Sequence, residues 1–148
     1  MTDGNNFFLR SNPEITLTSP SAARQVITVG GYQASNTSIY ADSGRGYTTT
    51  GEIKPDFVAP AVDVYGPGLR NNFITFTGTS AAAAITAGAC AQIMQWAIVD
   101  QNNTIMSHTS IKNMLIRGTA KPENRTYPNR EWGYGTLDVY GAFQNLRL

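Results

Sequence analysis

The 148-residue sequence contains few charged side chains, one cysteine and one histidine. Charged residues make up 14% of the chain and the formal net charge is +1, so no basic stripe is present and no nucleic-acid partner is expected. The single cysteine, Cys90, excludes an internal disulfide framework and a cysteine-based metal site. We expect neither a metal ion nor another cofactor.

Long apolar runs and targeting signals are also missing from the sequence. No uninterrupted apolar run reaches the length of a membrane span, and the opening residues MTDGNNFFLR lack the basic-then-apolar pattern of a signal peptide. The sequence therefore does not predict a membrane partner, and the cellular compartment stays open.

Glycine, serine, threonine and asparagine are abundant, and 41% of the residues are apolar. This composition and length predict one loop-rich α/β domain over residues 1–148. Short apolar or β-branched runs predict strands at Ile15–Thr18, Val26–Val29, Val62–Tyr65 and 73–76. The second run is continuously apolar and ends in a glycine pair, which favours a strand buried on both faces of a parallel sheet.

The longest predicted helix follows the stretch FITFTGTS and covers Ser80 to about Val99. Every residue in 81–91 is small or apolar except Thr86, which predicts a helix buried on all sides. Gly88 inside this helix costs about 1 kcal/mol relative to alanine, which indicates close packing against a neighbour. Further along this helix, we expect Met94, Trp96 and Ile98 to lie in the core.

A second helix is predicted at Ser110–Arg117, with Thr109 or Ser110 as its N-cap. Residues 127–143 predict a turn, a glycine-framed strand and a terminal helix. Trp132 and Tyr134 in this segment are expected to pack on the sheet.

Ser80 has two interpretations. Serine is a preferred N-cap because its hydroxyl accepts a hydrogen bond from a free backbone N–H. A serine on the first helical turn also has the positive dipole end and free N–H groups beside it, where a developing oxyanion would be stabilised. The nucleophile elbow G-x-S-x-G and the phosphate-binding P-loop are both absent around Ser80.

The wider sequence favours the second interpretation of Ser80. The stretch TGTSAAAAITAGA resembles the active-serine motif G-T-S-M-A-x-P-H-V-A-G of the subtilisin-like serine proteases (subtilases, peptidase family S8). The residues that fall on its positions are Gly78, Thr79, Ser80, Ala82, Ala87 and Gly88. Three further stretches resemble family segments in the family's order: PSAARQVITVGGY, IKPDFVAPAVDVYG and WGYGTLDVYGAF. Ala84 and Ile85 replace the usual Pro and His, a variant similar to subtilases of anaerobic or spore-forming bacteria.

The resemblance implies an α/β fold, part of a three-layer subtilisin-like domain with a mostly parallel sheet and a buried central helix starting at Ser80. It implies a serine endopeptidase that cleaves polypeptides through an acyl-enzyme. Ser80 would be the nucleophile, and Gly78 and Thr79 would support it and the oxyanion. A bacterial protein that is secreted or associated with the cell envelope or spore would fit this family.

The family's catalytic Asp and His blocks, D-T/S-G and H-G-T-H, are not found in the sequence. We expect residues 1–148 to be the C-terminal portion of a catalytic domain, inactive without the missing N-terminal half as a partner. His108 follows Ser80, at the start of a predicted surface helix, and is expected to be a cap or solvent contact. Asn5 is a weak match to the oxyanion-hole asparagine, and a loop role is favoured for it.

The other polar candidates have structural interpretations. Asp56 and Asp138 fall in the second and third of the further matching stretches, where structural roles are expected, and Arg45 is expected to pair with a carboxylate. Cys90 reads as a small buried apolar residue.

Two other functions stay open at this point. The first is a non-catalytic pseudoprotease or protein-association module that keeps the subtilase fold. The second, ranked last, is a carbohydrate- or surface-binding β-domain, suggested by the Asn, Thr, Gly and Tyr content. A sheet cut through its middle would also expose a strand edge, which predicts homo-oligomers of the isolated chain.

Overall fold

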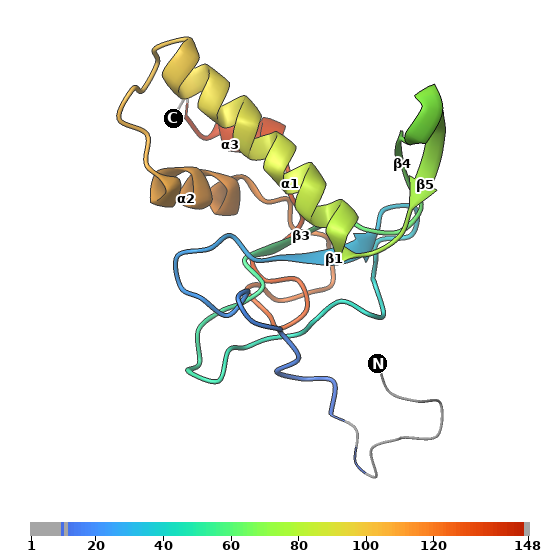
Figure 1. Ribbon diagram of the computed structural model, residues 1–148. Helices are drawn as coiled ribbons and strands as arrows, with labels where there is room; N and C mark the ends of the chain where they lie inside the picture. Colours follow the sequence, from blue (N-terminus) through green and yellow to red (C-terminus); the bar gives the residue numbers. More distant parts are fainter. Residues whose placement is uncertain (1–9, 11, 147–148) are drawn as a thin grey trace.

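The computed structural model describes residue 10 and residues 12–146. It is a small α/β structure in which α1 lies over one face of a short sheet, α2 and α3 pack beside α1, and loops cover the other face (Figure 1). The strands are β1 (Val29–Gln33), β2 (Ser38–Ile39), β3 (Phe57–Pro60), β4 (Val64–Pro67) and β5 (Phe73–Phe76). The helices are the 3₁₀ turn η1 (Leu69–Asn71), α1 (Thr79–Met94), the π-helical turn η2 (Gln95–Val99), α2 (His108–Gly118) and α3 (Val139–Gln144).

The described strands form a mixed arrangement rather than the mostly parallel sheet expected. β1 pairs with β3 in parallel and with β2 antiparallel, and β4 and β5 form a separate antiparallel hairpin. The hairpin stands away from the body of the molecule (Figure 1). Strand 73–76 is where the sequence predicted it, whereas β4 begins and ends two residues later than Val62–Tyr65.

Two strand predictions were wrong, and one strand was missed. The segment Ile15–Thr18 is irregular: Ile15 has a left-handed φ of 58°, and Thr16 N donates to the Arg45 carbonyl in a loop contact. Only the last residue of Val26–Val29 is in a strand. Strand β3 was not predicted, because Pro60 at its end was taken as a strand boundary.

Helix α1 is buried along one stripe and not on all sides. Its buried residues are Ala82, Thr86, Ala89 and Ile93, which recur every three or four positions. The other faces carry small and apolar residues that the described part of the chain leaves open. Gly88 lies on such a face, with no heavy atom within 4 Å of the position a Cβ would take, so the prediction of close packing there was wrong.

By length and composition alone, this helical segment is long and apolar enough to cross a membrane. Thr79–Val99 comprises 21 residues, and the most apolar window within it has a mean hydropathy of 1.4. Of the residues in that window, 28% are buried. Core helices of water-soluble proteins commonly pass the same test, so this observation is weak evidence for a membrane span.

The core lies where α1, α2 and α3 meet the sheet. Phe57, Ile93 and Leu115 are fully buried there and pack with Ile111 and Met114. Trp96 is half-buried against the Phe143 ring, with the centroids 5.7 Å apart. Met94 and Ile98 are 45% and 42% exposed, so the expectation that both lie in the core was wrong.

The caps of α2 and α3 differ from those expected. Ser107, and neither Thr109 nor Ser110, caps α2 by accepting a 3.1 Å hydrogen bond from Ser110 N. Asp138 caps α3 by accepting from Gly141 N at 2.9 Å, which confirms its structural role. Residues 127–137 contain isolated bridges in place of the predicted strand.

Candidate active site

Ser80 lies on the first turn of α1, directly after a sharp turn out of β5. Gly78 makes this turn with φ 142° and ψ 159°, a backbone conformation that residues with a Cβ rarely adopt. Gly78 N donates to the Ala61 carbonyl at 2.7 Å, and the Gly78 carbonyl accepts from Ala81 N at 3.0 Å. These bonds fix the direction in which the helix leaves the sheet.

The hydroxyl of Ser80 does not cap the helix. Gly78 occupies the N-cap position, and no side chain makes the capping hydrogen bond. Ser80 is exposed, and neither its hydroxyl nor its backbone N–H makes a hydrogen bond with another described residue. The positive end of the helix dipole therefore lies beside an accessible hydroxyl and a free N–H donor.

Thr79 lies close to the sheet at this helix start. A Cβ built on Gly31 in β1 would lie 3.4 Å from Thr79 Cγ2 and only 2.6 Å from Ala61 Cβ. Glycine at position 31 thus lets the first turn of α1 approach β1 closely. Gly78 and Thr79 thus lie directly before Ser80, at the point where the chain passes from the sheet into α1.

A cavity of about 510 Å³ lies beside Ser80, between α1 and the β4–β5 hairpin. The cavity wall is mainly apolar. None of the described residues that line it carries a carboxylate, an imidazole or an amine. The side chains that form it include Val64, Tyr65, Phe76, Ala84 and Ile85. The sequence analysis predicted the two strands but not that they pair or line a cavity. The short connection GPGLRNN between two β-branched runs is a hairpin signal that could have predicted the pairing.

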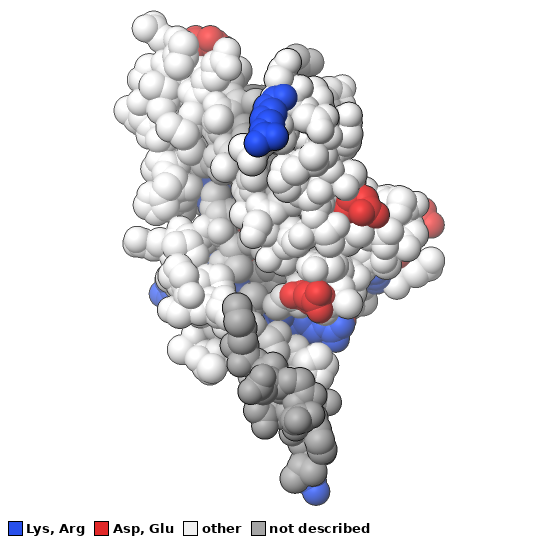
Figure 2. Space-filling view, turned by 45° about the vertical axis from the view of Figure 1, so that its right-hand side comes forward, with Lys and Arg blue, Asp and Glu red and all other residues white. Residues whose placement is uncertain are grey.

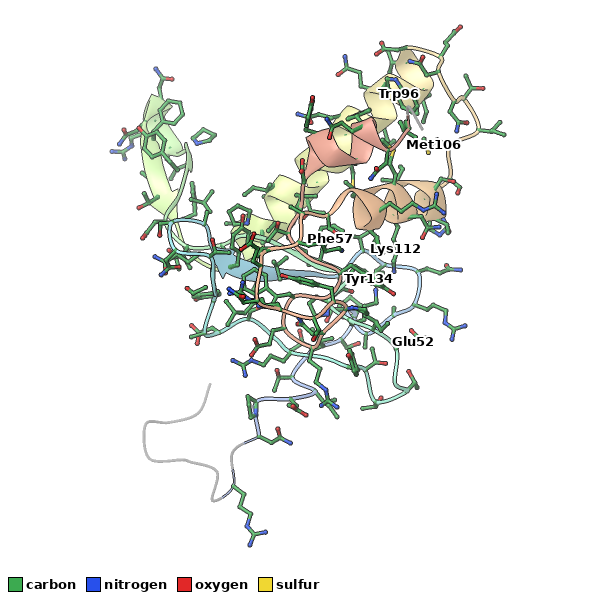
Figure 3. All side chains as sticks on the ribbon, turned by 180° about the vertical axis from the view of Figure 1, so that it is seen from behind. Glu52, Phe57, Trp96, Met106, Lys112 and Tyr134 are labelled. Carbon is green, nitrogen blue, oxygen red and sulfur yellow. The ribbon has the colours of Figure 1, made fainter. Side chains whose placement is uncertain are left out.

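No general base for Ser80 is found among the described residues. His108 is the first residue of α2, and its Nε2 lies 3.1 Å from Thr109 Oγ1. Figure 3 shows Met106, two residues before His108, close to Trp96 at the far end of the long helix. Trp96 lies sixteen helical positions after Ser80, which at about 1.5 Å per residue is roughly 24 Å. The structure therefore does not bring His108 to Ser80, and Asn5 lies outside the described residues.

Asp56 is part of a buried ion cluster away from Ser80. Its carboxylate lies 2.9 Å from Lys54 Nζ and 3.0 Å from Lys112 Nζ, and it accepts from Thr28 N at 2.7 Å. Figure 3 shows Lys112 near Phe57, the residue that follows Asp56. Burial lowers the pKa of Lys54, against the opposing effect of the Asp56 carboxylate. The structural role expected for Asp56 is confirmed.

The remaining polar and aromatic candidates have structural partners. Arg45 Nη1 lies 3.1 Å from Glu131 Oε1, as expected for an ion pair. Trp132 is 2% exposed and packs on Tyr32 of β1 with ring centroids 5.6 Å apart, and Tyr134 is half-buried. Cys90 is half-buried, and burial raises its pKa. Among the described residues, no group of three or more His, Cys, Asp or Glu side chains could hold a metal ion.

Comparison with known proteins gives consistent matches over most of the chain. Residues 3–135 match the model of the subtilase family. The chain is 32% identical over 147 residues to the serine protease AprX of Bacillus subtilis, covering 86% of this chain and 30% of AprX. It is 31% identical over 138 residues to the membrane-bound transcription factor site-1 protease of Mus musculus, covering 88% of this chain and 12% of that protein.

The fold is similar to a solved structure as well. The CspB protease of Clostridium perfringens superposes with a TM-score of 0.89 at 33% identity, covering 94% of this chain and 30% of that one. The chain thus spans under a third of the length of each of these three proteins.

Proposed function

The chain belongs to the subtilase family of serine proteases, and from this premise we propose that Ser80 is the nucleophile of a serine endopeptidase. The observation that carries the proposal is the exposed Ser80 hydroxyl at the positive end of α1, free of any capping bond. Polypeptides are the substrate class that membership of this family implies.

The reaction would proceed through an acyl-enzyme. Ser80 Oγ adds to the carbonyl carbon of a peptide bond while its proton passes to a general base. The oxyanion accepts a hydrogen bond from the Ser80 backbone N–H, strengthened by the helix dipole. The amine leaves with the proton, and water then releases the acyl group from Ser80.

In this proposal residues 1–148 are the C-terminal portion of a catalytic domain, and the base and its orienting carboxylate come from other sequence. Among the described residues, the cavity wall beside Ser80 contains no histidine or carboxylate, which supports this division. The 148-residue chain alone would be essentially inactive, because loss of the base reduces the rate by about a million-fold.

Labelling with a fluorophosphonate probe tests the proposal. The probe is added to the 148-residue chain and to a protein that includes whatever the reading frame encodes before Met1. Fast, stoichiometric labelling of the longer protein, lost in Ser80→Ala and kept in Ser35→Ala, is the expected result. Ser35 is a matched control because it is exposed and makes no hydrogen bond with another described residue. Equally fast labelling of the 148-residue chain would show that a base has been overlooked.

A second candidate function is a protein-association module that retains the fold without catalysis. It is favoured by apolar exposure on the hairpin, where Tyr65, Leu69 and Phe73 are 71%, 88% and 56% exposed. Figure 2 also shows one face of the molecule on which charged side chains are sparse. No labelling of Ser80 in the longer protein, together with concentration-dependent association in sedimentation, would favour this module over the enzyme.

A further inference from the structure

A second cavity, of about 750 Å³, lies against Trp132, away from the one beside Ser80. Gly31 of β1 approaches Thr79, the neighbour of Ser80, whereas the next residue, Tyr32, packs on Trp132. Successive residues of a strand point to opposite faces, so this cavity and the start of α1 lie on opposite faces of the sheet. Figure 1 shows loops of the last third of the chain covering this face.

The cavity contains three guanidinium groups that are held in place by their neighbours. Arg45 pairs with Glu131 at 3.1 Å, and Arg130 pairs with Glu14 and lies over the Tyr47 ring, 5.1 Å from its centroid. These contacts hold the planar groups in fixed orientations, so less side-chain entropy is lost when they bind an anion.

Arg125 differs from the other two arginines. Its guanidinium lies 4.4 Å from the centroid of the Trp132 ring, and its Nη2 donates to the Thr37 carbonyl at 2.9 Å. It forms no ion pair with a carboxylate of the described residues. Its side chain is exposed and the Tyr127 hydroxyl lies near its guanidinium, which leaves part of its five N–H donors for a ligand.

The cavity favours a particular kind of anion. Three guanidinium groups against two carboxylates leave an excess of one positive charge. The carboxylates of Glu14 and Glu131 would repel a densely charged chain such as a nucleic acid, but they permit ligands whose negative charges are spaced apart. The half-buried Tyr47 ring offers some apolar contact, whereas Trp132 is buried beneath Arg125, and a volume of about 750 Å³ exceeds what a single small anion fills.

We propose that this cavity binds an acidic polypeptide segment, with one of its carboxylates paired to Arg125 above Trp132. The site is independent of Ser80 and of the proposed catalysis. A planar carboxylate matches the guanidinium fork, and the rest of the peptide lies against Tyr47 and the polar side chains of Asn124 and Thr126.

Tryptophan fluorescence of the 148-residue chain tests the proposal. Trp96→Phe leaves Trp132 as the only tryptophan while keeping a ring against Phe143. In this background, a blocked peptide of alternating Glu and Ala is titrated against its Gln–Ala counterpart. We expect a saturable signal from the Glu peptide alone, with binding that weakens as salt is raised.

Two variants of equal charge separate the site from general surface attraction. Arg125→Gln should weaken binding of the Glu peptide by about tenfold, as loss of a charge-assisted hydrogen bond predicts. Arg117→Gln removes an exposed arginine at the end of α2 and should leave the Kd within about twofold. Arg125→Lys, which keeps the charge and loses the fork, should give an intermediate Kd.

Three results would overturn the proposal. Equal binding of the Glu and Gln peptides would exclude carboxylate recognition, and equal weakening by the Arg125 and Arg117 variants would leave only surface electrostatics. Displacement of the peptide by an equal concentration of inorganic phosphate would make the cavity a small-anion site. The comparison of the two peptides in the Trp96→Phe background needs no change at Arg125, so it stands if Arg125→Gln fails to fold.

Discussion

Lys112 Nζ lies 3.0 Å from Asp56 Oδ1, and this ion pair ties α2 to the residue immediately before β3. Lys54 Nζ holds the other carboxylate oxygen at 2.9 Å, so one buried carboxylate is shared by two ammonium groups. Both lysines also donate to the Val26 carbonyl, which brings the loop before β1 into the same cluster. The cluster joins three segments that are distant in sequence, and its loss should be felt throughout the fold.

Asp56→Asn should lower the free energy of unfolding by about 3 kcal/mol or more, because it leaves two buried or half-buried ammonium groups without a countercharge. Urea denaturation measures this change. Asp63→Asn is the control: Asp63 is exposed with φ 52°, a conformation that asparagine tolerates. Equal stability of the two variants would show that the cluster contributes nothing.

Gly118→Ala and Gly88→Ala should change stability in opposite directions. A Cβ at position 118 would lie 2.3 Å from Ala142 N, forcing α3 away from α2 at a cost of about 1–3 kcal/mol. At position 88 the Cβ meets nothing within 4 Å, so alanine should stabilise α1 by up to about 1 kcal/mol through helix propensity. Thermal melts of both variants test this pair, and destabilisation by Gly88→Ala would mean that something covers this face.

Ser80→Ala and Ser107→Ala separate the two roles a serine can have at a helix start. Ser107 caps α2, so its replacement should lower stability by about 1 kcal/mol. Ser80 makes no capping bond, and its replacement should change stability by less than about 0.5 kcal/mol. A loss at Ser80 as large as that at Ser107, measured by urea denaturation, would restore the capping interpretation.

Cys90 should react slowly with alkylating reagents, and its rate should rise only above the pH range of an ordinary thiol. Burial raises the pKa of Cys90 in the folded chain, so less reactive thiolate is present at a given pH. In the unfolded chain the Cys90 thiol loses its proton at lower pH than in the folded chain. The thiol's contribution to folding stability is therefore complete below the pKa that it has in the unfolded chain. That contribution declines as the pH rises through the pKa of Cys90 in the folded chain.

Iodoacetamide labelling across this pH range, with and without urea, measures the effect. The midpoint of the rate should lie at higher pH in the native chain than in urea. Identical midpoints in both conditions would show that burial does not act on the thiol.

Local sequence patterns predicted the parts of the fold that depend on near neighbours. The run 73–76, the long helix from the Gly-Thr-Ser stretch, and the helix around Ser110–Arg117 are all present, with ends shifted by a few residues. The resemblance to the subtilase family rested on short motifs in the family's order, which can be recognised in a sequence without knowledge of the fold. The pairing of Arg45 with a carboxylate was also expected, although Glu131 could not be named, because 86 positions separate the two residues.

The sequence by itself determined where a helix with Ser80 at its mouth would form, because hydrogen bonding and helix propensity act over a few residues. Tertiary structure alone decided which face of that helix is buried, since this depends on where β1, β3 and α2 lie in space. It also decided that Gly78, and not Ser80, is the N-cap, because the chain leaves the sheet at an angle that only glycine accepts readily. The two cavities likewise arise from segments far apart in the chain, and no local pattern encodes such contacts.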